Sequence, residues 1–179
     1  MTSSLVEIPL YPSVAPMPTA VAKFNAEGLR RSKEIDCFAF VPSSAAVLFT
    51  VLDNLPRCRF YEWGCGIGIN LGIAEMLGFQ SMSVEIDAPL ASGAQKLLAD
   101  FGLTAIVEKG NYFEIQRDSD LYFVYSWPGK IAETEAHFLS VAPMDAQLLI
   151  CCGACDIRCK ARPETARKLG FVTERVEMP

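Results

Sequence analysis

The stretch FYEWGCGIGIN, residues 60–70, places three glycines at alternate positions behind a carboxylate. An apolar run precedes the glycines and apolar residues at helical spacing follow them, which is typical of a strand, a turn and a helix in succession. Glycine lets a ligand approach the main chain closely, here beside Glu62. In an open α/β sheet the first such turn faces the crevice where ligands bind, so this stretch decides both the fold class and the place of the site.

The composition is that of a mildly acidic globular chain. It has 179 residues, 51% of them hydrophobic and 21% charged, with a formal net charge of -5. Acidity disfavours nucleic acid as a partner, because phosphate binding needs clustered Lys and Arg. No apolar run approaches about 20 residues, so no contact with a membrane is expected. Seven cysteines, an odd count, and the absence of a signal-peptide pattern predict a cytoplasmic protein with free thiols.

Outside the glycine stretch, short apolar runs alternate with amphipathic segments. Strands are expected at 58–63, 81–86, 104–110, 120–126 and 146–153, and strand-like alternation recurs at 170–178. Helices are expected within 19–35, 40–56, 69–78, 88–102, 129–142 and 163–170, with Ser43 or Ser44 and Asp87 as N-caps. This alternation predicts a three-layer α/β/α, doubly wound and mostly parallel sheet with an N-terminal helical extension.

Two boundaries follow from the composition along the chain. Residues 1–18 are rich in proline and small residues and are expected to form an irregular arm. Residues 19–179 are expected to form a single domain, because about 160 residues suit one hydrophobic core.

The glycine spacing rules out two phosphate-binding motifs. The dinucleotide motif G-x-G-x-x-G would need glycine where Ile69 or Leu71 stands, and no Lys follows the glycines as G-x-x-x-x-G-K-[ST] requires. Glu62 would repel a pyrophosphate but can accept hydrogen bonds from an ammonium group. Glu85 ends the next strand about 20 residues on, where an acidic side chain can bind two ribose hydroxyls. The two carboxylates therefore indicate a nucleoside that carries an amino acid.

From about residue 40 to residue 178, the chain resembles a class I, seven-strand, Rossmann-like methyltransferase that depends on S-adenosylmethionine. The passages EWGCGIG, SVEID and KGNYFE carry the resemblance and occur in that family's order and spacing. The resemblance implies S-adenosyl-L-methionine as the cofactor. The cofactor-binding residues that it implies are Glu62, Gly64, Cys65, Gly66, Gly68, Asn70, Glu85, Ile86, Asn111 and Tyr112.

The resemblance also implies roles for some of these residues. Glu62 and the backbone around Gly64 and Gly66 would hold the methionine part. Glu85 would bind the ribose hydroxyls, and Ile86 would pack on the adenine. Asn111 stands where the family often has an Asp that accepts the adenine amino proton, and its amide oxygen can do the same. Either Tyr112 or Phe113 would add an aromatic wall.

The methyl acceptor would meet the cofactor at the end of the fourth strand, which reads Tyr125-Ser126-Trp127-Pro128-Gly129. This segment resembles the N/D/S-P-P-Y/F/W motif of methyltransferases that act on planar or amine nitrogens, although Trp127 and Gly129 depart from it. The implied catalytic positions are Ser126, Trp127 and Tyr125: a hydroxyl and the Trp127 carbonyl to orient an amine, and an aromatic face from Trp127 or Tyr125. Alternatively, this segment is only a turn with a core-facing Trp127. The passage FVPSS, residues 40–44, also resembles an approach seen in some lysine-directed members.

Four cysteines invite a metal hypothesis. Cys151, Cys152, Cys155 and Cys159 include one C-x-x-C, a spacing found in zinc and iron-sulfur sites. However, Cys151 and Cys152 fall on an expected strand, where neighbouring side chains point to opposite faces. We therefore expect buried thiols and no metal.

The sequence supports an S-adenosylmethionine-dependent methyltransferase acting on a small-molecule or protein amine acceptor. The alternative is a noncatalytic module of the same fold that binds the cofactor or a protein partner, because two positions of the acceptor motif depart. A purely structural alternative is that the glycines only form a tight turn and that Glu85 and Asp87 only cap a helix. An NAD-dependent oxidoreductase is disfavoured by the glycine spacing. The acceptor and the oligomeric state stay open.

Overall fold

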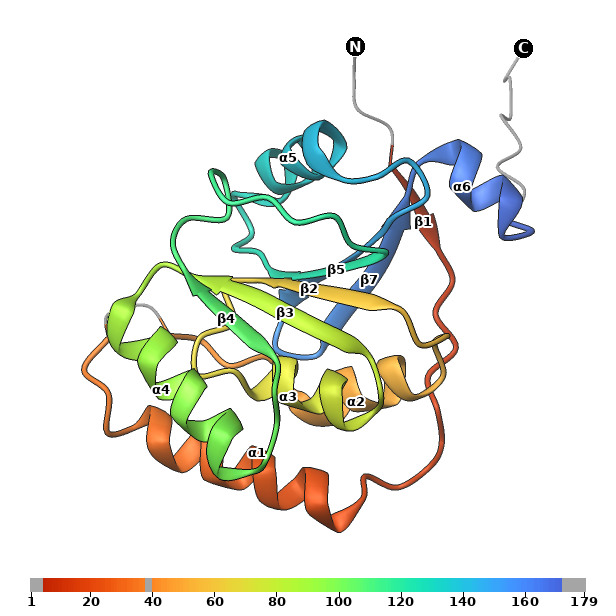
Figure 1. The fold of residues 1–179 in the computed structure, drawn as a ribbon. Coiled ribbons are helices and arrows are strands. Elements are labelled where there is room, and N and C mark those ends of the chain that lie inside the picture. Colours follow the sequence, from red (N-terminus) through yellow and green to blue (C-terminus); the bar gives the residue numbers. More distant parts are fainter. Residues whose placement is uncertain (1–4, 38–39, 172–179) are drawn as a thin grey trace, which may run out of the picture.

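The computed structural model describes residues 5–37 and 40–171, and in it seven strands form one sheet in the order β1-β7-β6-β5-β2-β3-β4 (Figure 1). The strands are β1 (Val6–Ile8), β2 (Arg59–Trp63), β3 (Gln80–Glu85), β4 (Ile106–Lys109), β5 (Leu121–Tyr125), β6 (Gln147–Gly153) and β7 (Asp156–Ala161). The helices are α1 (Thr19–Ser32), α2 (Ala45–Asp53), α3 (Ile69–Met76), α4 (Ala88–Asp100), α5 (Ile131–Val141) and α6 (Pro163–Lys168).

The central strands have the doubly wound parallel arrangement. β2 pairs in parallel with β3 and with β5, and the parallel pairing continues to β4 on one side and β6 on the other. The chain therefore proceeds outward from β2 in one direction, returns, and proceeds outward in the other, so strand order reverses between β2 and β5. The predicted fold class is confirmed.

Two strands were not predicted. β7 is antiparallel to both β6 and β1, and β1 completes the edge with Val6 opposite Ala161 and Ile8 opposite Cys159. The expectation of an irregular arm is therefore wrong at Val6–Ile8, whereas residues 9–18 contain no helix or strand. Three residues are too few for a periodic signal, and this strand exists because β7 offers it a paired edge. The outer boundaries of the domain stay a prediction. Most of the strand-like segment at 170–178 lies outside the described residues.

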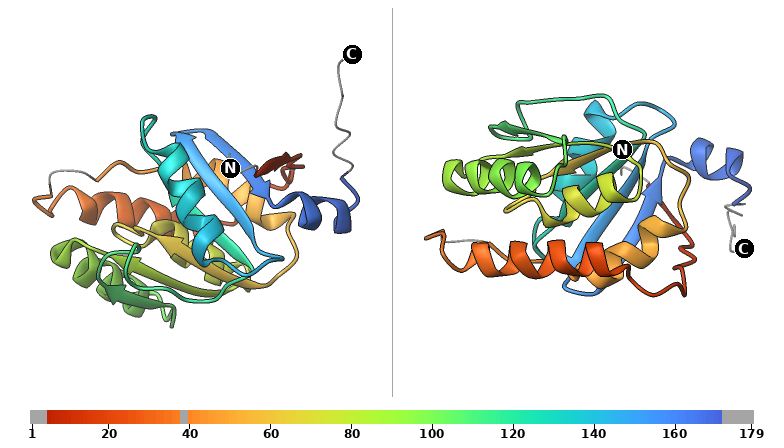
Figure 2. Two further views of the ribbon diagram at one scale, coloured as in Figure 1. Left: turned by 90° about the horizontal axis from the view of Figure 1, so that it is seen from above. Right: turned by 60° about the horizontal axis from the view of Figure 1, so that its bottom comes forward.

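Side chains that alternate along the strands build one core on each face of the sheet. In Figure 1, α1 to α4 lie below the sheet and α5 above it. Phe60 and Phe123 point into the lower core, while Tyr61, Trp63 and Tyr122 point into the upper core. α1 packs on α3 and α4, and the right view of Figure 2 shows α1 to α4 together on one side of the sheet. The sheet is thus covered on both faces, as parallel sheets require.

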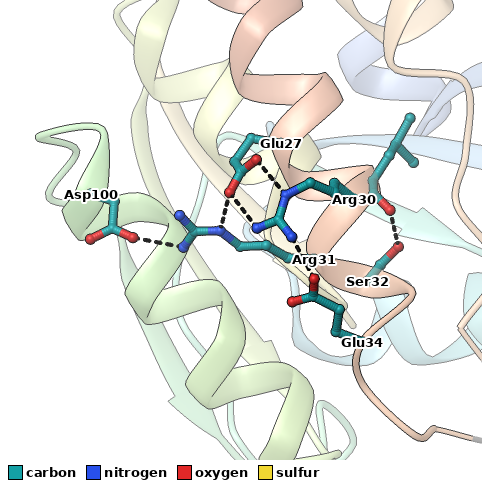
Figure 3. Close-up of polar contacts among 7 residues, drawn as sticks. Glu27, Arg30, Arg31, Ser32, Glu34 and Asp100 are labelled. Atoms are coloured by element: carbon teal, nitrogen blue, oxygen red, sulfur yellow. Dashed lines mark hydrogen bonds and ion pairs between the residues drawn. The ribbon is translucent and has the colours of Figure 1, made fainter.

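A surface ion pair joins α1 to α4, next to further ion pairs along α1. Arg31 lies 2.7 Å from Glu27 on its own helix and 2.7 Å from Asp100 at the end of α4 (Figure 3). Arg30 pairs with Glu27 and Glu34 in the same group. Such surface pairs contribute about 0–1 kcal/mol each. The arginines of this helix are therefore paired with carboxylates of the chain itself.

The close packing of α1 against α3 predicts that a larger residue at Gly72 destabilises the fold. A Cβ at Gly72 would lie 2.2 Å from Cζ of Phe24, a side chain with 0% exposure. We expect Gly72→Ala to lower the free energy of unfolding by about 1–3 kcal/mol through overpacking, although alanine favours helix. Urea unfolding measures the change. Gly129→Ala is the control, because a Cβ there meets no atom within 4 Å. Equal midpoints for the two variants would contradict the prediction.

Candidate functional site

A cavity of about 440 Å³ opens at the carboxyl ends of β2, β3 and β5, where the strand order reverses. Its walls come from the glycine stretch, from the end of β3, from residues 40–43 ahead of α2, and from the residues that follow β5. The volume falls within the range of small-molecule sites. The crevice predicted from the strand-turn-helix pattern therefore exists in the folded chain.

Glu62 supplies a buried carboxylate to the cavity wall. The side chain is 1% exposed; its Oε1 accepts a 3.0 Å hydrogen bond from Nδ2 of Asn70, and its Oε2 has no hydrogen-bond partner. Burial raises the pKa of Glu62 to about 8, the Asn70 hydrogen bond opposes the rise, and the charge of Glu85 adds to it. A buried oxygen without a partner is costly, so a cation beside Oε2 would satisfy it.

The glycines open the backbone to this cavity. Gly64 and Gly66 both line it and have positive φ angles of 76° and 56°. The space that a Cβ would fill at Gly64 is open, whereas at Gly66 it is taken by the ring of Phe40, 2.4 Å away. Gly68 serves packing instead, because a Cβ there would meet Ala94 of α4 at 3.0 Å.

Glu85 is fixed at the end of β3 by main-chain donors. Its Oε2 accepts a 2.7 Å hydrogen bond from the amide of Gly66, and its Oε1 a 2.9 Å bond from the amide of Asp87. Each carboxylate oxygen keeps a lone pair for a further donor. Asp87, not Glu85, caps α4 by accepting from the amide of Leu90 at 2.9 Å. Helix capping therefore does not explain Glu85, and the purely structural alternative is wrong for this residue.

The cavity gathers every predicted cofactor residue except Gly68 and Asn111. The side-chain oxygen of Asn111 accepts a 3.0 Å hydrogen bond from the amide of Phe113, which engages it in a local turn. Ile86 is 67% exposed and lines the cavity beside Glu85. Tyr112 forms a wall backed by the buried Trp63, with ring centroids 5.2 Å apart and planes 8° from parallel.

Sequence reasoning did not assign Phe40 and Ser43 to the site. Ser43 Oγ accepts a 3.0 Å hydrogen bond from Nδ2 of Asn70, the amide that also bonds Glu62. The signal that could have found them is the FVPSS passage at 40–44.

The three predicted catalytic positions are divided between two cavities. Tyr125 and Trp127 line the main cavity, and their rings meet edge to face at 5.7 Å. Ser126 does not line it; this buried residue lines a second cavity, and its hydroxyl lies 3.2 Å from Oγ1 of Thr134. Trp127 is 50% exposed, so the core-facing alternative for this residue is wrong.

The cysteines are dispersed. Cys151 and Cys159 are buried in the lower core, Cys152 packs on the upper core, and Cys155 is exposed. Within residues 5–37 and 40–171, no three Cys, His, Asp or Glu side chains come together as a metal-binding group. A membrane-spanning helix is likewise absent from that part of the chain.

By sequence, the chain matches no protein-family model and no curated protein. By structure, it is similar to a methyltransferase from Geobacter sulfurreducens, with 16% identity and a TM-score of 0.58 over 76% of this chain and 75% of that one. It is also similar to the SAH-bound methyltransferase of Podospora anserina, with 15% identity and a TM-score of 0.57 over 75% of this chain and 62% of that one. The chain thus spans less than two thirds of the Podospora protein. At these identities the likeness establishes the fold, which is that of class I methyltransferases.

Proposed function

We propose that the main cavity binds S-adenosyl-L-methionine and that the protein is a methyltransferase. One observation carries the proposal: the partnerless Oε2 of Glu62 lies in the buried wall of a cavity where the main chain at Gly64 is bare. An ammonium group beside Glu62 would stabilise its ionised form, whereas a diphosphate beside it would be repelled by that charge. An ammonium next to ribose hydroxyls is the pattern of a nucleoside bearing an amino acid.

Residues at the ends of neighbouring strands could each bind one part of such a ligand. Glu62, held by Asn70, would bind the ammonium, and Glu85 would bind the ribose hydroxyls with the lone pairs that its two main-chain contacts leave free. Ile86 and Tyr112 provide apolar surface for the base. The fold supports this assignment, because ligands of doubly wound sheets bind where the strand order reverses.

When bound, the sulfonium cofactor supplies a methyl group activated for in-line displacement. The chain would contribute position and shelter from water rather than a covalent nucleophile. Tyr125 and Trp127 lie where the main cavity meets the second one, so they would frame the path between methyl group and acceptor. A small molecule and a protein amine are both acceptors to test.

Calorimetry with S-adenosylhomocysteine tests cofactor binding on the purified protein. We expect a dissociation constant on the order of micromolar, and no binding of NAD, because the cavity wall presents a carboxylate to the pyrophosphate. If S-adenosylhomocysteine gives no heat at millimolar concentration while NAD binds, the proposal is wrong.

Two contacts favour the noncatalytic module as a second candidate. The Phe40 ring covers Gly66, and the Ser126 hydroxyl is engaged by Thr134. Such a module would bind cofactor without turnover. Transfer of a labelled methyl group to a component of a cell extract, lost in Glu62→Gln, would exclude it.

A further inference from the structure

A second cavity of about 150 Å³ adjoins the main one. The two share Tyr112, Tyr125 and Trp127, so a molecule in the second cavity would lie next to a ligand in the first. Phe113, Ser126 and the start of α5 complete its lining. A cavity of about this volume takes a benzene ring in an engineered protein.

Aromatic side chains make most of its apolar surface. The ring centroids of Tyr112 and Phe113 are 4.4 Å apart, and those of Tyr125 and Trp127 are 5.7 Å apart. Phe113 is 40% exposed and Trp127 is 50% exposed, so part of each ring is open to solvent. Tyr112 is held in place by its stack on Trp63. Fixed ring faces of this kind favour a flat aromatic ligand.

The buried hydroxyls give the cavity a polar group of defined direction. Thr134 Oγ1 lies 3.0 Å from the carbonyl oxygen of Lys130, which can only accept, so Thr134 donates its proton there. The arrangement consistent with that bond has Ser126 donating to Thr134 across their 3.2 Å contact. With its proton committed, Ser126 offers only lone pairs to a ligand. The cavity therefore suits a ligand that carries an O–H or N–H donor.

The charges at the cavity do not select a cation. Glu133, its one carboxylate among the described lining residues, is paired with Lys130 at 2.6 Å. The two charges offset each other, and the ammonium of Lys130 would repel a second ammonium in its neighbourhood. A lysine side chain of a protein substrate would find no free carboxylate in this lining.

We propose that the second cavity binds the methyl acceptor and that the acceptor is a neutral, planar aromatic or heteroaromatic molecule whose O–H or N–H group donates to Ser126. The proposal rests on the proposed function and narrows its acceptor from any amine or small molecule to one ring class. Thr134 is a positioning residue in this scheme, because it acts only by turning the Ser126 hydroxyl.

The test uses the two indole N–H signals of the protein in ¹H–¹⁵N spectra, since the chain has two tryptophans, Trp63 and Trp127. Phenol, toluene and butylammonium are titrated separately into protein saturated with S-adenosylhomocysteine. We expect phenol to shift the Trp127 signal, toluene to bind about fivefold more weakly, and butylammonium to leave the signal unchanged. In Ser126→Ala, phenol is expected to weaken to the level of toluene, while toluene itself is unchanged. Ser140→Ala, an exposed serine of α5, is the control.

Other results would contradict separate parts of the proposal. A Trp127 shift with butylammonium but not phenol overturns the ring class and favours a lysine-like acceptor. No shift with any probe, while S-adenosylhomocysteine binds, overturns the acceptor cavity but not the cofactor site. Phenol binding that Ser126→Ala leaves intact overturns the hydrogen bond. Failure of S-adenosylhomocysteine binding, with the phenol response retained, overturns the proposed function and not the preference for rings.

Discussion

Glu62→Gln is expected to weaken binding of S-adenosylhomocysteine by about 100-fold or more and, above pH 8, to make the free protein more stable than the parent. The carboxyl group is buried, and its pKa is raised from 4.5 to about 8. A raised carboxyl pKa means that folding favours the protonated form. Its contribution to stability is therefore fully present below pH 4.5 and is lost as the pH rises toward 8. Glutamine has the same shape and never ionises, so it escapes this loss.

The stability gain should be near zero at pH 4.5 and about 5 kcal/mol well above pH 8, because the rise from 4.5 to about 8 is about 3.5 pKa units at about 1.4 kcal/mol each. Urea unfolding at both pH values measures it. The affinity loss should be about 100-fold or more, since a buried ammonium would lose its charged partner. Glu7→Gln, an exposed carboxylate of β1, makes the same charge change and should alter neither quantity. Parent-like affinity in Glu62→Gln would remove the basis of the proposed cofactor site.

The site residues that could be predicted from the sequence are those whose role depends on their near neighbours in the chain. Glu62 and Gly64 stand two residues apart at a strand end, so spacing alone placed a carboxylate beside bare backbone. Glu85 was placed by the same logic one strand later. The helices were placed by apolar spacing and by caps, of which Asp87 is confirmed by its bond to Leu90.

The features that could not be predicted from the sequence depend on contacts between residues that are distant in the sequence. β7 has small inward residues, Cys159 and Ala161, whose weak apolar signal does not mark a strand, and it forms because β6 and β1 pair with it. The commitment of Ser126 to Thr134 depends on how α5 docks on the sheet. The turn that engages Asn111 is set by its bond to Phe113 rather than by the motif around it.

Arg162→Met should be among the most destabilising single substitutions in the chain. Arg162 follows β7 and is 8% exposed. Its guanidinium donates to the carbonyl oxygens of Leu139 at 2.9 Å, Ala142 at 3.0 Å and Pro143 at 2.7 Å. These groups lie in and just after the last turn of α5, where helix carbonyls lack partners and the helix dipole favours a cation. The guanidinium also lies 5.5 Å from the centre of the buried Phe138 ring.

Methionine fills similar volume but donates no hydrogen bond, so buried carbonyls lose their donors. We expect a loss of about 3–4 kcal/mol in the free energy of unfolding, because each buried unsatisfied group costs about 1–3 kcal/mol and some will reach water. Arg162→Lys keeps the charge and should lose about half as much. Arg158→Met, in β7 just before Arg162, is the matched control, because the Arg158 side chain is 47% exposed and its ion pair is with the nearby Asp156 at 2.9 Å. It should change stability by less than about 0.5 kcal/mol. If the Arg162 and Arg158 variants unfold at the same urea concentration, the end of α5 is held by the packing of Phe138 alone.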